Sequence, residues 1–311
     1  MARTRIVLSP HDAAGSAAQA AVRHHLDALV RQQAGALSGD VEAIHQLRVA
    51  TRRLRAALRL FRPYLAAPKP EAVRQELAWL ASVAGAVREL DVTEELSRER
   101  AGKLHLNPGM KLEPLWRDLK ARRRREHRKL VAVLGSARYR RLLNELGKPF
   151  SISPEGDAPL AAVAVELARP ILRKTAQAGE EAEAKPAAAT LHGLRVSVKR
   201  SRYALEMLAP LAGRKLAKPL KRLEAMQDLL GRYHDAVVAA GIVQRWADEA
   251  EPRGAAALGA GALIESLRRR EGKLGLRSLE LWKKINGRKM EREVVDALKG
   301  PASQPQVALN R

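Results

Sequence analysis

Hydrophobic and basic side chains recur with a helical period in AIHQLRVATRRLRAALRLFRPYL, residues 43–65. At about 100° per residue, five positions fall within roughly 80° of one another on a helical wheel: Leu47, Thr51, Leu54, Leu58 and Phe61. A row of basic residues falls on an adjoining arc of roughly 100°. This basic ladder consists of His45, Arg48, Arg52, Arg55, Arg59 and Arg62. The pattern predicts an amphipathic helix with a buried apolar face, and Arg53 points away from the ladder.

The same pattern recurs in TLHGLRVSVKRSRYALEMLAPLA, residues 190–212, with each position 147 further along the chain. The apolar face repeats as Leu194, Val198, Leu205 and Leu208. The ladder repeats as His192, Arg195, Lys199 and Arg202, with Glu206 in place of Arg59, and Arg200 corresponds to Arg53 and likewise points away from it. Like charges at these spacings repel, so a chain that keeps them twice is expected to hold an external anion there. A solvated helix face is the alternative, and the repetition weighs against it.

The repeat extends to about 145 residues in each half. Helix-forming residues dominate, and the alternating patterns of β-strands do not occur. We therefore expect an all-α fold of two pseudo-symmetric four-helix bundles that arose by internal duplication. The bundles should span residues 1–147 and 159–299, joined by a Pro- and Gly-containing linker at 148–158. Residues 300–311 should form a disordered tail.

Local signals predict where several helices begin and end. A first helix is expected over residues 9–37, with a serine cap followed by proline. A third helix is expected over residues 71–90. Asp91 and Asp235 occupy matching positions in the two halves, and we interpret both as helix caps rather than catalytic carboxylates. The sequence NPG at 107–109 predicts a turn.

Charge narrows the choice of partner. The 311 residues carry a formal net charge of +23, which predicts a polyanion: nucleic acid, an anionic membrane surface or a phosphate polymer. Aromatic residues make up only 3%, which disfavours binding of single strands by base stacking. The chain has no cysteine, so disulfides and thiolate metal sites are excluded. No signal peptide or membrane span is expected, and a cytoplasmic protein without a membrane partner is predicted.

The segments HQLRVATRRLRAALRLF and HGLRVSVKRSRYALEML resemble the CHAD domain, the conserved histidine α-helical domain. VRELDV at 87–92 and MQDLLGRYHDAVV at 226–238 support this resemblance, which covers nearly the whole chain. It implies two similar helical bundles that bind inorganic polyphosphate, in some members on polyphosphate granules. The matching positions are His45, Arg48, Arg52, Arg53 and Arg55 in the first half and His192, Arg195, Lys199, Arg200 and Arg202 in the second.

In a further basic run at residues 122–129, the stretch from Arg122 to Arg125 alone covers more than about 180° of a helix, so only part of the run can face one ligand. Arg124, His127 and Arg128 share one strip and are candidate phosphate-binding residues. No glycine loop of the Walker type and no carboxylate cluster for magnesium point to catalysis. The ladder faces also lack the acidic and histidine residues of a metal site. Neither a metal nor a cofactor is expected.

The sequence thus predicts non-catalytic binding of inorganic polyphosphate by the two ladders, with recruitment to polyphosphate granules. Arginine forks pair with phosphate oxygens in bidentate fashion, and lysine adds a point charge. Surrounding positive charge should disfavour protonation of His45 and His192, whereas bound phosphate should favour it. Three alternatives stay open: a protein that binds the nucleic-acid backbone, an enzyme that processes polyphosphate, and a scaffold that recruits acidic proteins.

Overall fold

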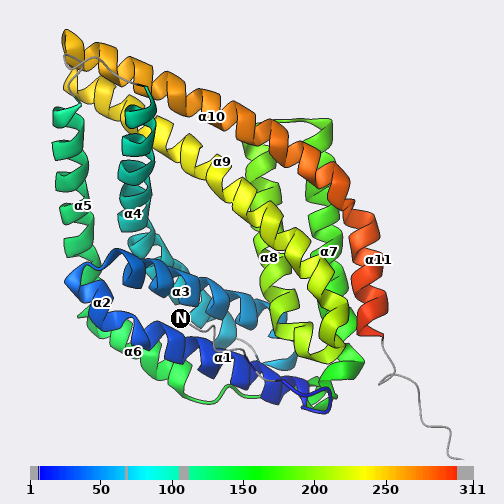
Figure 1. Ribbon diagram of the computed structural model, residues 1–311. Coiled ribbons are helices and arrows are strands. Elements are labelled where there is room, and N and C mark those ends of the chain that lie inside the picture. Colours follow the sequence, from blue (N-terminus) through cyan, green and yellow to red (C-terminus); the bar gives the residue numbers. More distant parts are fainter. Residues whose placement is uncertain (1–5, 7, 67–68, 105–111, 300–311) are drawn as a thin grey trace, which may run out of the picture.

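The computed structural model describes residues 6, 8–66, 69–104 and 112–299, and these contain eleven α-helices and no strand (Figure 1). The helices are α1 (Ala14–Arg31), α2 (Gln33–Ser38), α3 (Val41–Leu60), α4 (Lys69–Lys103), α5 (Glu113–Leu134), α6 (Ala137–Gly147), α7 (Leu160–Ala184), α8 (Ala188–Ala212), α9 (Ala217–Ala250), α10 (Ala255–Ile285) and α11 (Gly287–Leu298). Three short 3-10 helices are η1 (Arg62–Tyr64), η2 (Pro154–Asp157) and η3 (Gly213–Leu216). The predicted all-α fold is confirmed. The predicted turn at 107–109 and tail at 300–311 lie outside the described residues.

The ladder helix of the first half is α3, and an aspartate caps its N-terminus. Gly39 ends α2 in the left-handed region with φ of 85°. Asp40 then accepts a hydrogen bond from the backbone N–H of Ala43 at 2.6 Å. The residues buried along the apolar face are Leu47, Thr51, Leu54, Leu58 and Phe61. The corresponding helix α8 buries Leu194, Val198, Leu205 and Leu208. Both predicted amphipathic helices are confirmed.

The first helix begins later than the sequence predicts. Ser9 does not cap it: the Ser9 backbone N–H donates to Asp12 Oδ2 at 2.7 Å, and α1 begins at Ala14. The backbone oxygen of Asp12 accepts from the N–H of Leu160 at 2.8 Å, so the segment before α1 is hydrogen-bonded to the start of α7. At the other end, Gln32 separates α1 from α2. Contacts between distant segments therefore replace the single long helix that the local signals predict.

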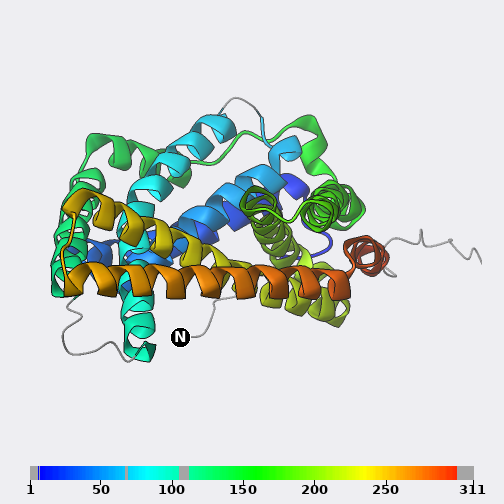
Figure 2. The same ribbon diagram turned by 90° about the horizontal axis from the view of Figure 1, so that it is seen from above.

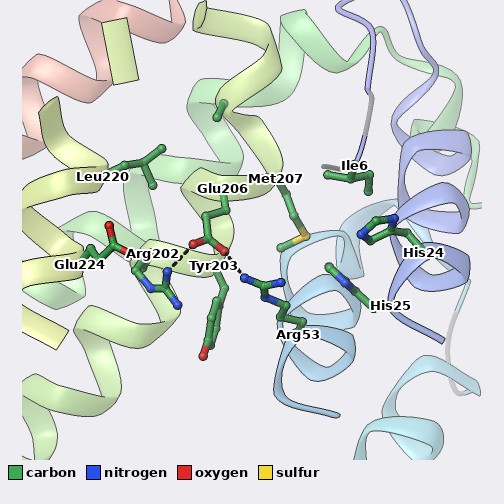
Figure 3. A pocket seen from close by; sticks show the side chains of 11 residues that line it. Ile6, His24, His25, Arg53, Arg202, Tyr203, Glu206, Met207, Leu220 and Glu224 are labelled. Atoms are coloured by element: carbon green, nitrogen blue, oxygen red, sulfur yellow. Dashed lines mark hydrogen bonds and ion pairs between the residues drawn. The ribbon is translucent and has the colours of Figure 1, made fainter. Parts of the chain in front are cut away.

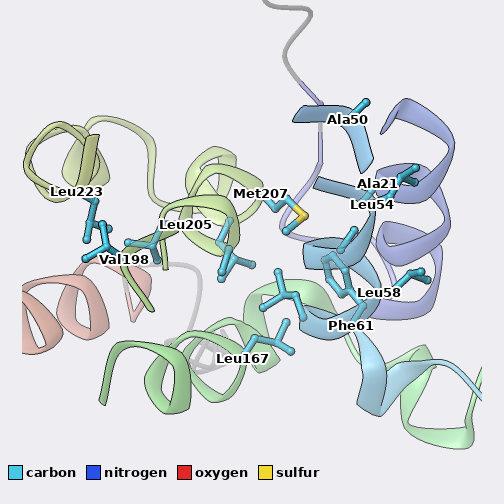
Figure 4. Close-up of a cluster of buried hydrophobic side chains, with 14 of the residues drawn as sticks. Ala21, Ala50, Leu54, Leu58, Phe61, Leu167, Val198, Leu205, Met207 and Leu223 are labelled. Atoms are coloured by element: carbon cyan, nitrogen blue, oxygen red, sulfur yellow. The ribbon is translucent and has the colours of Figure 1, made fainter. Parts of the chain in front are cut away.

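One hydrophobic core runs through both halves of the chain. Leu54, Leu58 and Phe61 of the first half pack in the same cluster as Leu167 of α7 and Leu205 of α8, and Figure 4 shows these side chains between the helices. The helix order also repeats, since α1, α3, α4, α5 and α6 are followed by α7, α8, α9, α10 and α11. The division of this arrangement into two four-helix bundles stays a prediction.

A second, smaller core joins α4, α5, α9 and α10. Trp116 of α5 and Trp246 of α9 are its largest members, and they pack with Leu96 and Leu263. The four helices meet at the upper left of Figure 1, and Figure 2 shows the long α10 crossing the molecule together with α9. Helices α4 and α9 contribute residues to both cores, which hold them in place beside α3 and α8. No helix in the described ranges has the length and apolarity of a membrane span.

Asp91 is not a helix cap, contrary to the prediction, because α4 continues through it as a single helix. Arg123 of α5 donates to the Asp91 carboxylate at 2.5 Å and to the backbone oxygen of Gly39 at 3.0 Å. The prediction is wrong for Asp235 as well, since this residue lies in the middle of α9. Apolar residues beside both positions pack into the second core, and this packing overrides the local capping signal.

Replacing Asp91 by alanine should lower the free energy of unfolding by about 3 kcal/mol, because it leaves a largely buried guanidinium without its carboxylate. The side chains of Arg123 and Asp91 are only 22% and 5% exposed. Urea unfolding of the variant would measure the loss. The matched control is Asp296→Ala, which removes a carboxylate that is 75% exposed. Equal stability of the two variants would show that the ion pair between α4 and α5 does not hold these helices together.

Candidate functional site

A cavity of about 600 Å³, here called the central cavity, lies between α3, α4, α8 and α9. Helix α3 lines it with His45, Arg48 and Arg52, and α8 lines it with Arg195 and Lys199. Arg48 and Arg52 correspond to Arg195 and Lys199 in the two repeats, whereas His192, the counterpart of His45, is not in the lining. The structure therefore brings part of both basic ladders onto one cavity.

The remaining walls come from residues of α4 and α9 that were not predicted as site residues. They are Arg88, Glu89 and Val92 in α4, and Gln227, Asp228, Gly231, Arg232, His234, Asp235 and Val238 in α9. Arg88 and Arg232 lie 144 positions apart, the same spacing as the matching residues Asp91 and Asp235. This repetition is the sequence signal that points to the pair. The sequence alone does not show that Arg88 and Arg232 point into one cavity, because this depends on how the two halves of the chain pack.

Positive charge dominates the central cavity, where five arginines and one lysine face three carboxylates. Burial, followed by the charges of Arg195 and Arg52, lowers the pKa of Lys199 to about 6. Burial and the charge of Arg52 lower the pKa of Arg48 to about 10. Burial raises the pKa of Asp235, although the neighbouring cations oppose this. The cations thus destabilise one another as long as no anion is bound.

Three histidines lie in or beside this field. Burial, followed by the charge of Arg88, lowers the pKa of His45, and burial with the charge of Arg195 lowers that of His192. The predicted direction is confirmed for both, although burial is the larger cause. His234 has its pKa lowered to about 3, again by burial first and then by Arg195. Its ring centroid lies 5.8 Å from that of His192, which is exposed and lies beside the central cavity rather than in its lining.

Several nitrogen donors at the site lack partners. The Nε atoms of Arg52 and Arg195 are buried and make no hydrogen bond. The guanidinium of Arg48 lies over the backbone of Gly85, with Nη2 3.8 Å from the place where a Cβ would stand. Unpaired buried donors are costly, so the arrangement is suited to an incoming acceptor. No group of three His, Asp or Glu side chains in the described ranges is placed to hold a metal ion.

Arg53 and Arg202 lie instead in a second cavity of about 290 Å³ (Figure 3). Arg53 Nη2 donates to the Glu206 carboxylate at 3.1 Å. Arg202 is only 6% exposed and donates to the same carboxylate and, at 2.8 Å, to Gln227 Oε1. These two predicted site residues are therefore bound by protein groups and do not face the central cavity with Arg195.

Seven predicted residues line neither cavity: Arg55, Arg59, Arg200, Arg124, His127, Arg128 and His192, which lies beside the central cavity near His234. The first three lie near one another beside the crossing of α3 and α8, and they are considered below. His127 Nε2 is hydrogen-bonded to the backbone oxygen of Ala36 at 2.9 Å, which ties α5 to α2. Arg124 and Arg128 are exposed on α5. The structure thus separates the strip on α5 from the two ladders.

Comparison with known proteins gives relatives over most of the chain. The sequence profile of the CHAD domain matches residues 20–244. Two curated proteins of Mycobacterium tuberculosis are each 28% identical over 229 residues: the uncharacterized protein MT2285 of strain CDC 1551 / Oshkosh and the uncharacterized protein Rv2226 of strain ATCC 25618 / H37Rv. The matches cover 70% of this chain and 43% of each relative, so the chain spans less than half the length of these relatives.

Two solved structures share the fold. The CHAD domain from the plant Ricinus communis has a TM-score of 0.68 and 24% identity, and the match covers 98% of both chains. PptA from Streptomyces chartreusis has a TM-score of 0.67 and 21% identity, with 86% of this chain and 99% of that chain covered. The profile match spans well over half of the sequence and includes both ladder helices. The chain belongs to the CHAD domain family.

Proposed function

We propose that the central cavity binds inorganic polyphosphate, a linear anion with a negative charge on every phosphate. The observation that supports this most directly is the convergence of Arg48, Arg52, Arg195 and Lys199 from two distant segments on one cavity. Arginine forks match phosphate oxygens, and lysine adds a point charge. A bound chain would replace the mutual repulsion of these cations by attraction and would satisfy the free nitrogen donors.

The shape and lining of the cavity favour a thin phosphate chain over nucleic acid. Four helices enclose a cavity of about 600 Å³. Duplex DNA is too wide to enter it, since its major groove alone is about 12 Å across. A duplex would therefore touch only the rim. Among the described residues that line the cavity, none is Phe, Tyr or Trp, the side chains on which single-stranded bases stack.

The proposed role is binding without turnover, and recruitment to polyphosphate granules in the cytoplasm would follow from the same contact. We further propose that the two ladders reflect an internal duplication into two related bundles. Under this interpretation each half supplies one wall of the cavity, α3 with α4 and α8 with α9. A scaffold that gathers acidic proteins would not need arginines of both halves to converge on one cavity.

The proposal is tested by titrating the protein with long-chain polyphosphate, duplex DNA and single-stranded RNA over a series of salt concentrations. Polyphosphate should stay bound at physiological salt, whereas both nucleic acids should dissociate, since they reach fewer cations of the cavity. Equal and equally salt-sensitive binding of all three would indicate a general anion surface. Release of phosphate from the polymer in the presence of magnesium would show that the protein is an enzyme.

A further inference from the structure

The two repeats differ at one position of the basic ladder, where Arg59 of α3 corresponds to Glu206 of α8. Helices α3 and α8 cross and pack against each other. Each side of this crossing, here called a flank, holds basic residues from both helices, and the residues on one flank correspond to those on the other in the two repeats. One flank holds Arg53, Arg202 and Glu206, and the other holds the corresponding Arg200, Arg55 and Arg59. The change from arginine to glutamate therefore gives the two flanks different charge.

The flank with Glu206 is closed by protein groups. Its carboxylate lies between the guanidinium groups of Arg53 and Arg202 and forms an ion pair with each (Figure 3). Both guanidinium groups also lie near the ring of Tyr203, with Cζ to centroid distances of 5.9 and 5.0 Å. A protein carboxylate thus occupies the place where an external anion would meet these arginines.

On the opposite flank, no carboxylate among the described residues bridges the arginines in this way. Arg55, Arg59 and Arg200, here called the outer arginine cluster, form no ion pair with an acidic residue in the described part of the chain. Glu71 acts on Arg59, but its two carboxylate oxygens accept hydrogen bonds from Arg74. Burial, followed by the charges of Arg200 and Arg74, lowers the pKa of Arg59 to about 10. Arg55 Nε is buried without a hydrogen-bond partner.

We propose that the outer arginine cluster is a second phosphate subsite, which continues the central cavity on one flank only and holds a polyphosphate chain where it leaves the cavity. This inference rests on the proposed function of the central cavity. Arg48, Arg52, Arg55 and Arg59 lie four, three and four residues apart on one face of α3 and span about 16 Å. A chain that follows this face passes from the cavity onto the cluster, whereas on the other flank the arginines are already paired with Glu206.

The subsite gives the protein a preference for chain length. An oligophosphate that fits inside the central cavity does not reach the outer arginine cluster and gains nothing from it. A long chain contacts both, and it emerges on the flank of Arg59 rather than on that of Glu206. Length discrimination therefore separates this subsite from the cavity itself.

The test is Arg59→Glu, which converts the open flank into a copy of the closed one. The new carboxylate would lie between Arg55 and Arg200 as Glu206 lies between Arg202 and Arg53, so the variant has a precedent in the same fold. The dissociation constant of long-chain polyphosphate should rise about tenfold or more, since charged hydrogen bonds are lost. That of tripolyphosphate should stay within about twofold. Calorimetry at one salt concentration measures both.

Two further variants keep the result interpretable. Arg200→Gln removes one cation of the cluster without adding a carboxylate, and it should show a smaller loss with the same length dependence. Arg173→Glu makes the same charge change as Arg59→Glu on an exposed residue of α7, and it should leave both ligands unaffected. Unchanged binding of long chains, or an equal loss for both lengths, would overturn the subsite while leaving the cavity as proposed. If the unaltered protein binds neither ligand, both proposals fail.

Discussion

Replacing Arg48 and Arg195 together by alanine should weaken binding of long-chain polyphosphate by about tenfold or more, since each hydrogen bond to a charged group contributes about 1.5–3 kcal/mol. The two residues occupy corresponding positions on α3 and α8 and line the same cavity. Two lost phosphate contacts should also make the slope of log affinity against log salt shallower by about 1.5. Binding titrations at several salt concentrations measure both effects.

The double variant should fold normally, because the charges of Arg48 and Arg195 repel each other in the empty cavity. Its melting temperature and helical circular dichroism should match those of the unaltered protein. The control is Arg173→Ala with Arg277→Ala, which removes the same charge from exposed positions on α7 and α10. An equal loss of affinity in the control would mean that total charge, rather than the central cavity, governs binding.

The periodicity of the sequence predicts those helices whose own residues define a continuous apolar face. Helices α3 and α8 follow from their repeated leucines, and Asp40, directly before the pattern of α3, caps that helix. Asp91 and Asp235 have equally good capping signals, yet both lie inside long helices. The difference lies in tertiary packing. The second core forms only when α4, α5, α9 and α10 pack together, and this packing cannot be predicted from the local sequence.

The candidate site was predictable only in part, for the same reason. Arg48 and Lys199 share a cavity because α3 crosses α8, whereas Arg202 on the same predicted ladder is bound by Glu206. The sequence shows that Glu206 replaces Arg59, but not that this glutamate reaches Arg53 across the two halves. Repetition identifies which residues are kept, and the packing of the halves decides which of them face one another.

Replacing Lys199 by methionine should stabilise the empty protein and weaken its binding of polyphosphate. The pKa of Lys199 is lowered from 10.5 to about 6, by burial first and then by Arg195 and Arg52. Between these two values the unfolded chain binds more protons than the folded protein, so stability rises with pH across this window. The penalty is complete below pH about 6 and disappears above pH about 10.5. Methionine removes it, so the melting temperature should rise by about 5 °C near pH 6 and by less near pH 9.

Bound phosphate would reverse this balance, because it favours the ammonium form that the empty cavity disfavours. Binding near pH 7.5 should therefore take up protons, and affinity should increase as the pH falls towards 6. His45, His192, His234 and Asp235 titrate at the same site, so the readout is the difference between Lys199→Met and the unaltered protein. Calorimetry in buffers of different ionisation enthalpy should show about one proton fewer taken up by the variant. Lys273→Met, at an exposed position on α10, should change neither quantity. If Lys199→Met leaves stability and proton uptake unchanged, the lysine is already charged in the empty cavity, and repulsion among the cations does not prepare it for an anion.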